Sequence, residues 1–199
     1  FQERTERIRL AIELKQPDRV PFAPFVSFFP VRYAGVSFED AMHDYDKLAT
    51  AVKKFILDFQ PDAFADTFRL LAWAPTLEIV DYKQLVWPGY GGKPNTTYQF
   101  VEGEYMKAEE YDAFLADPSD FLLRSFLPRV WGVMEPFKKL RPLSWAWYTR
   151  SAAYVSSFGT PEMAAAFEAL VKAGQESQKF IAKGRDFTRE MESLGFPRQ

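Results

Sequence analysis

The chain has 199 residues and a net charge of −2, and 47% of its residues are hydrophobic and 17% aromatic, enough for one domain with a sizeable core. No block of like charge marks a nucleic-acid surface, and no apolar run approaches the roughly 20 residues that cross a bilayer. We therefore expect neither a nucleic acid nor a membrane as a partner. The absence of cysteine excludes disulfides and thiolate ligands in this chain, and we predict a cytoplasmic location.

The first half of the chain predicts a helix, a strand, a loop and a second helix. Residues 5–15 form the first helix, and the apolar run 20–26 is typical of a buried strand whose prolines allow only an early or edge position. A loop with Arg32 and Gly35 leads into a patterned helix at 37–59. A strand that delivers a lone arginine ahead of a helix is typical of the active-site rim of a β/α barrel. The alternative is an arginine on a surface loop.

Residues 62–68 are the second predicted strand, and the helix before them would be the crossover of a parallel pair. Asp66 then lies near the carboxyl end of this strand, where parallel α/β folds bind ligands. Its carboxylate could accept a proton or hold a cation, or it could simply cap the strand. His43 lies off the apolar stripe of the helix, which favours a solvated residue over a ligand.

Residues 76–105 lack a helical period, and we interpret them as a β-hairpin excursion with a long loop, suited to a lid or an interface. Its turn-rich stretch 87–95 contains several glycines. No helix start follows these glycines, so we reject a phosphate-binding loop.

A short helix is predicted at 109–115, and Asp117 should cap the next helix, which Pro128 kinks or splits. The aromatic run 142–149 is the third predicted core strand, and Tyr154 falls in the loop at its carboxyl end.

Thr160 is a strong helix start, and the helical region should run to about Leu194 and close at Gly195. No linker appears, and we predict a single domain over residues 1–199.

Several short motifs, in order and spacing, resemble the uroporphyrinogen decarboxylase superfamily. That family also includes methyltransferases that move a methyl group between a corrinoid protein and a thiol or folate acceptor. The matching pieces are Asp18–Pro21, Val31–Gly35, Asp40–Asp44, Asp62–Asp66 and Pro142–Trp145.

The resemblance implies a TIM-type (β/α)8 barrel, represented here by about its first three β/α units plus the hairpin excursion. Such a barrel needs roughly 250 residues, so the resemblance implies that this chain is an amino-terminal fragment. A half barrel leaves strand edges unpaired, and we expect the missing carboxyl-terminal half or a second copy to cover them.

The family's decarboxylases carry an Arg-Gln-Ala-Gly-Arg motif whose arginines bind substrate carboxylates. Here Arg32 keeps the first arginine and Val36 replaces the second. The resemblance assigns substrate binding to Arg32, Gly35 and Tyr154 and a catalytic role to Asp66.

The resemblance favours a corrinoid-dependent methyltransferase-like enzyme acting on a methylcorrinoid and a small acceptor. The alternatives are a uroporphyrinogen decarboxylase, binding a tetrapyrrole, and a non-catalytic remnant that binds a flat ligand or a partner protein. Methyltransferases of this branch bind zinc through His and Cys ligands in the carboxyl half. We therefore expect no metal site in this chain, and zinc and a corrinoid only in a full-length protein.

Overall fold

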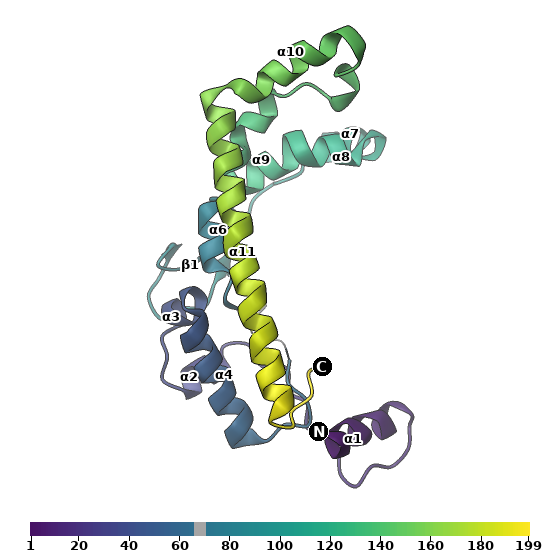
Figure 1. Cartoon of the computed structure of the whole chain (residues 1–199), viewed down its shortest axis with the longest axis vertical. Coiled ribbons are helices and arrows are strands. Elements are labelled where there is room, and N and C mark those ends of the chain that lie inside the picture. Colours follow the sequence, from purple (N-terminus) through teal and green to yellow (C-terminus); the bar gives the residue numbers. More distant parts are fainter. Residues whose placement is uncertain (66–70) are drawn as a thin grey trace. The chain divides into compact units, whose positions relative to one another are not determined.

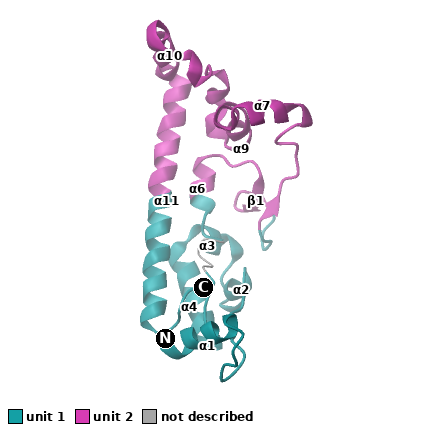
Figure 2. Ribbon diagram, turned by 90° about the vertical axis from the view of Figure 1, so that its right-hand side faces the viewer, with its two compact units in different colours: residues 1–75, 93–97, 177–199 teal, residues 76–92, 98–176 magenta. Residues whose placement is uncertain are grey.

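The computed structural model describes residues 1–65 and 71–199 and is mostly helical, with 63% helix. Its described residues form two compact units, which Figure 2 shows in different colours. Unit 1 comprises residues 1–75, 93–97 and 177–199, and unit 2 comprises residues 76–92 and 98–176.

The helices of unit 1 are labelled in Figure 1. They are α1 (Gln2–Ile12), α2 (Phe29–Tyr33), α3 (Phe38–His43) and α4 (Tyr45–Phe59), together with the second part of α11 (Pro161–Ser193).

Unit 2 contains short helices, a small sheet and the first part of α11. Its elements are α6 (Ala74–Ile79, of which residues 76–79 belong to this unit), β1 (Leu85–Pro88), β2 (Gly91–Gly92), β3 (Gln99–Phe100), η1 (Ala108–Glu110), α7 (Tyr111–Ala116), α8 (Pro118–Phe121), η2 (Leu122–Phe126), α9 (Leu127–Val130), η3 (Gly132–Lys139), η4 (Leu143–Trp145), η5 (Tyr148–Arg150), α10 (Ser151–Ser156) and η6 (Ser157–Gly159).

The predicted TIM barrel is wrong. Among the described residues, the named strands form one three-stranded mixed sheet in the order β2-β1-β3, and no barrel-like β/α repeats occur. Residues 20–26 belong to no strand. Residues 142–149 contain two 3₁₀ helices, η4 and the start of η5. Of the predicted second strand, Phe64 makes a single bridge to Arg198, and residues 66–68 lie outside the described part of the chain.

The local backbone explains why these segments are not strands. Two prolines in residues 20–26 remove amide donors, and Phe25 is 74% exposed rather than buried against a sheet. In the third segment, Tyr148 has φ of +50°, which no β-strand accommodates.

The predicted helix at 37–59 forms as two helices, because Asp44 interrupts it. Asp44 has an extended backbone, and its Oδ1 accepts hydrogen bonds from the amides of Asp46 and Lys47, both at 3.0 Å. A short acidic side chain that bonds nearby amides favours a cap over a helix interior. The start at Ser37 is as predicted, since its Oγ accepts from the Asp40 amide at 3.0 Å.

The helix α11 confirms the predicted start at Thr160 and the closure at Gly195. Thr160 Oγ1 accepts from the Met163 amide at 3.3 Å. Gly195 has φ of +91°, and the Phe196 amide donates to the Met191 carbonyl at 3.0 Å, as in a Schellman motif. Phe196 and Met191 are both buried, so the cap also delivers the chain end into the core of unit 1.

The core of unit 1 forms around α4, whose buried side chains recur at helical spacing. They are Leu48, Ala51, Val52, Phe55 and Ile56. Both α2 and α3 pack on α4. On α11, Phe187 packs edge-to-face on Phe64 at 6.0 Å between ring centroids.

The carboxylate of Asp62 joins the N-terminal region to this unit. It is fully buried, and its Oδ1 accepts from Arg7 at 2.6 Å and from Arg19 at 2.7 Å. Its Oδ2 accepts from the Phe22 amide at 2.8 Å. Arg7 also binds both oxygens of Asp18, each at 2.6 Å. Since α1 has no buried residue, these polar contacts are a main attachment of the N-terminal helix.

Burial would raise the pKa of Asp62, but the hydrogen bonds from the Phe22 amide, Arg7 and Arg19 outweigh it and hold the pKa below its ordinary value. The hydrogen bond from Arg7 lowers the pKa of Asp18 to about 2. Both groups therefore stay charged in the folded protein at neutral pH.

Unit 2 has its own core and its own ion pairs. The buried cluster consists of Met134, Phe137, Leu140, Met163 and Ala166.

Two arginines tie the short helices of unit 2 together. Arg124 binds Asp120 and donates to the Leu140 carbonyl at 2.9 Å. Arg129 binds Glu110, and this hydrogen bond lowers the pKa of Glu110 to about 2. Asp117 caps α8 as predicted, and Pro128 lies in a short helix after a π-helical stretch, so the predicted split is also confirmed.

Within residues 1–65 and 71–199, no helix combines the length and apolar content needed to cross a bilayer.

Replacing Asp62 with Asn should lower the free energy of unfolding by about 3 kcal/mol or more, because Arg7 and Arg19 lose their buried counter-charge. Urea unfolding monitored by circular dichroism measures the change. The control is Asp46→Asn, which removes a carboxylate that is 78% exposed and paired with Lys183. That variant should lose little stability, and an equal loss in both variants would contradict the role given to Asp62.

The stability of the chain should fall as the pH drops from about 4 towards about 2. The carboxyls of Asp18 and Asp62 have lower pKa values in the folded protein than in the unfolded chain, where an aspartate titrates near ~3.9. The unfolded state therefore binds more protons in this window. Urea unfolding at a series of pH values tests this, and Asp62→Asn should show a shallower dependence. Stability that stays constant across the window would count against the argument.

Candidate functional site

Arg32 lies in the last turn of α2, and not in a loop after a strand. The aromatic residues on either side of it fix this helix on α4. Phe29 packs edge-to-face on Phe55 with ring centroids 5.8 Å apart, and the Tyr33 hydroxyl donates to Asp58 Oδ2 at 2.9 Å. Val31 is completely buried. The backbone of Arg32 is therefore held firmly while its side chain remains exposed.

Gly35 ends this helix in a Schellman motif. The Val36 amide donates to the Val31 carbonyl at 3.0 Å, and the Gly35 amide donates to the Arg32 carbonyl at 3.1 Å. Gly35 has φ of +72°, which glycine adopts without the penalty that other residues pay. The same turn directs the chain from α2 into α3.

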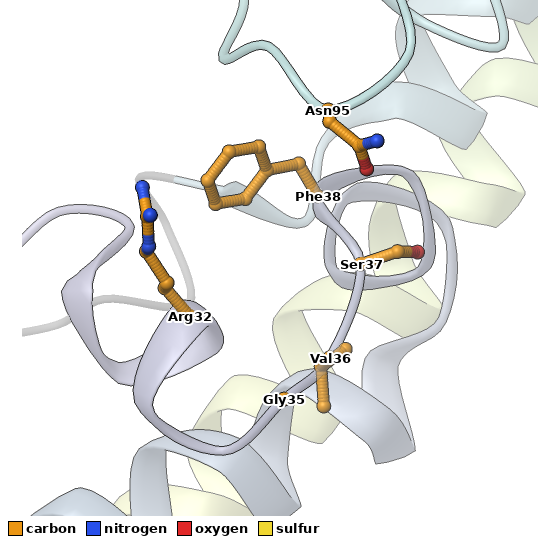
Figure 3. A pocket seen from close by; sticks show the side chains of 6 residues that line it. All are labelled: Arg32, Gly35, Val36, Ser37, Phe38 and Asn95. Atoms are coloured by element: carbon orange, nitrogen blue, oxygen red, sulfur yellow. The ribbon is translucent and has the colours of Figure 1, made fainter.

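An open pocket of about 520 Å³ lies over this turn, within unit 1. Figure 3 shows the side chains of its lining, which are those of Arg32, Gly35, Val36, Ser37, Phe38 and Asn95. The Phe38 ring extends from the start of α3 towards the Arg32 side, and Asn95 approaches from a separate loop. Of the predicted site residues, the structure brings Arg32 and Gly35 together here.

The Phe38 ring, which forms the aromatic wall of the pocket, is fixed by packing on another ring. Phe38 packs edge-to-face on the nearly buried Phe28, with ring centroids 4.9 Å apart. The Ser37 hydroxyl is already engaged, because its Oγ accepts from the Asp40 amide and donates to Asp40 Oδ2 at 2.8 Å. The pocket thus presents a fixed ring and a hydroxyl that is already engaged.

Asn95 reaches the pocket from the turn at residues 93–96. It has φ of +59°, a conformation that asparagine tolerates better than most residues. The Thr96 hydroxyl donates to the Lys93 carbonyl at 2.7 Å and tightens this turn. The turn-rich composition of residues 87–95 indicated a loop, but nothing in the sequence showed that its end lies beside Arg32. Phe38 and Asn95 were therefore missed as site residues.

The guanidinium of Arg32 makes no hydrogen bond or ion pair with the described residues. Three arginines near the N-terminus differ, since Arg7 and Arg19 bind Asp62, and Arg9 binds Glu6 and Glu13. An unpaired guanidinium beside an aromatic ring offers planar donors for a carboxylate or a phosphate.

The remaining predicted site residues have different outcomes. Asp66 lies outside the described residues, so its catalytic role stays a prediction. Tyr154 is in α10, not in a loop, and is 5% exposed, packed edge-to-face on Phe158 at 5.6 Å. It belongs to unit 2, whereas Arg32 belongs to unit 1. The three strand ends that were to gather these side chains do not form among the described residues.

The donor set does not fit the zinc site that the resemblance implies for the whole protein. The chain has no cysteine and a single histidine. His43 Nδ1 lies 2.8 Å from the Glu39 carbonyl, to which it can only donate. Among the residues that the structure describes, no group of three His, Asp or Glu side chains is arranged to hold a metal ion.

A second polar cluster lies in unit 2, beside a pocket of about 270 Å³. Asp81 Oδ1 accepts from the Tyr90 hydroxyl at 2.8 Å, and its Oδ2 lies 2.5 Å from Lys83 Nζ. Burial and the hydrogen bond to Asp81 raise the pKa of Tyr90 to about 12, so this phenol remains a donor. Its charges are mutually satisfied, which makes this cluster a weaker ligand site than Arg32.

Replacing Gly35 with Ala should lower the free energy of unfolding by about 1 kcal/mol, because alanine strains at positive φ. No atom lies within 4 Å of the added Cβ, so a steric clash does not contribute. Gly174→Ala is the matched control, since it also meets open space but lies inside α11. Helix propensity predicts that this control gains stability, and urea unfolding of both variants should give opposite signs.

No protein-family model, no curated protein and no solved structure matches this chain.

Proposed function

We propose that the chain binds the anionic group of a ring-containing ligand at Arg32, as the ligand-binding part of a corrinoid-dependent methyltransferase-like enzyme. The observation that carries the proposal is the unpaired Arg32 guanidinium on the wall of the pocket of about 520 Å³. The link to this enzyme class rests on the sequence motifs that resemble the uroporphyrinogen decarboxylase superfamily.

The chemistry of the lining favours an anion attached to an apolar plane. A guanidinium binds carboxylate or phosphate with two parallel hydrogen bonds, each stronger than a bond between neutral groups. The Phe38 ring provides an apolar surface for a flat ligand. The Asn95 amide adds a donor and an acceptor at the opposite edge. Together these groups favour a carboxylate or phosphate attached to a ring system over a simple anion.

Val36 favours the methyltransferase hypothesis over the decarboxylase hypothesis. It occupies the position of the second arginine in the decarboxylase motif and lines the same pocket as Arg32. A tetrapyrrole with many carboxylates needs several cations, because an unpaired charge removed from water costs several kcal/mol. One guanidinium suits a ligand that presents a single anionic group at this point.

The described lining supports binding more directly than catalysis. It consists of Arg, Gly, Val, Ser, Phe and Asn side chains, among which no carboxylate or imidazole is available to move a proton. Within the proposal, Asp66 keeps its predicted catalytic role. The His and Cys ligands of a zinc ion would have to lie in the carboxyl-terminal half that the resemblance implies, since this chain has no cysteine and one histidine.

Isothermal titration of the 199-residue chain with methylcobalamin and with coproporphyrinogen tests the proposal. We expect saturable binding of methylcobalamin, and Arg32→Gln should weaken it about tenfold or more, the value of a charge-assisted hydrogen bond. Arg185→Gln is the control, because Arg185 is also exposed, lies in unit 1 and is absent from the pocket.

A second variant separates the two enzyme classes. Val36→Arg adds a second guanidinium to the pocket and should strengthen binding of coproporphyrinogen, which carries several carboxylates, more than that of methylcobalamin. Binding of coproporphyrinogen alone to the unmodified chain would favour the decarboxylase. If neither ligand binds, both the methyltransferase and the decarboxylase hypotheses are wrong.

A further inference from the structure

The stretch from Arg141 to Val155 in unit 2 exposes an unusual amount of aromatic and aliphatic surface. Trp147 is 74% exposed and Tyr148 is 82% exposed. Leu143 and Val155 are also more than half exposed. We name this stretch the 141–155 segment. Clustered exposed aromatics of this kind mark an interaction surface on a folded protein.

The charge of the 141–155 segment is entirely positive. From Pro136 to Pro161 the sequence has four basic residues and no acidic residue. The guanidinium carbons of Arg141 and Arg150 lie 4.5 and 5.5 Å from the centre of the Trp145 ring. Neither arginine pairs with a carboxylate among the described residues. Stacking on one ring holds both planar donors close together and ready for acidic partners.

A second stretch of unit 2, residues 99–115, has the opposite charge and also exposes apolar side chains. Phe100 is 76% exposed and Leu115 is 71% exposed. Four exposed carboxylates lie in the same stretch and make no ion pair with the described residues: Glu102, Glu104, Glu109 and Asp112. We name this stretch the 99–115 segment.

We propose that the 141–155 segment of one copy binds the 99–115 segment of a second copy of this chain. Both segments are exposed in a single copy, and their charges are complementary. A twofold pairing would use each segment on both copies, so that the contact closes on itself. An anionic lipid surface would satisfy Arg141 and Arg150, but it would repel the carboxylates of the 99–115 segment and leave Phe100 and Leu115 exposed.

Trp147, Tyr148 and the two arginines should dominate the binding energy, since Trp, Tyr and Arg are the residues most enriched at interface hot spots. The flanking carboxylates should mainly set the pairing and its salt dependence.

Sedimentation velocity of the 199-residue chain, from about 1 to about 100 μM, tests the proposal in the affinity range of a moderate interface. We expect reversible self-association that weakens as salt is added. The double variant Trp147→Ser with Tyr148→Ser should raise the dissociation constant at least about tenfold. Phe25→Ser is the control, because Phe25 is equally exposed, at 74%, but lies in unit 1.

A charge exchange identifies the two surfaces. Arg141→Glu with Arg150→Glu should abolish self-association, and so should Glu102→Lys with Glu104→Lys. Mixing these two variants should restore a complex, because both reciprocal contacts then join opposite charges: one contact is unchanged and the other has its charges exchanged. Circular dichroism spectra verify that each variant is folded.

Three results would overturn the proposal. These are a chain that stays monomeric over the whole concentration range, self-association unchanged by the Trp147 and Tyr148 substitutions, and failure of the mixed charge variants to form a complex. Binding of the monomer to phosphatidylserine vesicles without self-association would assign the 141–155 segment to a lipid surface instead.

Discussion

The buried carboxylate of Asp62 is the constraint on which the N-terminal part of this protein depends. A charge that is removed from water must be paired, or it destabilises the fold by several kcal/mol. Arg7, Arg19 and the Phe22 amide meet that requirement from three separate positions in the chain. Because α1 has no buried side chain of its own, this polar contact is a main attachment of the helix, together with the contacts of Arg4 with Gln60 and the Phe196 ring. Two of the motifs that resemble the decarboxylase superfamily, Asp18–Pro21 and Asp62–Asp66, meet at this point through Arg19 and Asp62.

The pocket beside Arg32 depends on a different kind of constraint, which is local and aromatic. The short helix α2 would not be stable alone, since five residues provide few internal hydrogen bonds. The packing of Phe29 and the Tyr33–Asp58 hydrogen bond fix it on α4, and the Schellman turn at Gly35 then leads into α3. The neighbours of Arg32 supply the anchoring of this helix, and the Arg32 guanidinium makes no ion pair with the residues that the structure describes. Under the proposed function, this leaves the guanidinium available to a ligand.

The barrel expectation failed because strands depend on partners and helices largely do not. The runs at 20–26, 62–68 and 142–149 have the apolar content of buried strands, but each needs a neighbouring strand to receive its backbone hydrogen bonds. In the structure the Asp62 amide donates to the Phe22 carbonyl, and the Phe22 amide donates to the Asp62 side chain. The backbone of Phe64 is hydrogen-bonded to Pro197 and Gln199 near the C-terminus, and not to a neighbouring core strand. The aromatic residues of the third run stay exposed, which produces the surface that we assign to a second copy.

Local residue patterns specify the helices and their ends wherever a cap or a periodic apolar stripe is strong. Interactions between residues a few positions apart account for five features: the start at Thr160, the closure at Gly195, the caps at Ser37 and Asp117, and the buried stripe of α4. Such local interactions can be predicted from the sequence. The break of the predicted 37–59 helix at Asp44 is also local, because Asp44 caps the second helix. Tertiary packing, in contrast, buries Tyr154 in α10 and places Asn95 beside Arg32. These features depend on contacts between residues far apart in the chain, whose energies exceed local preferences and leave no local pattern in the sequence.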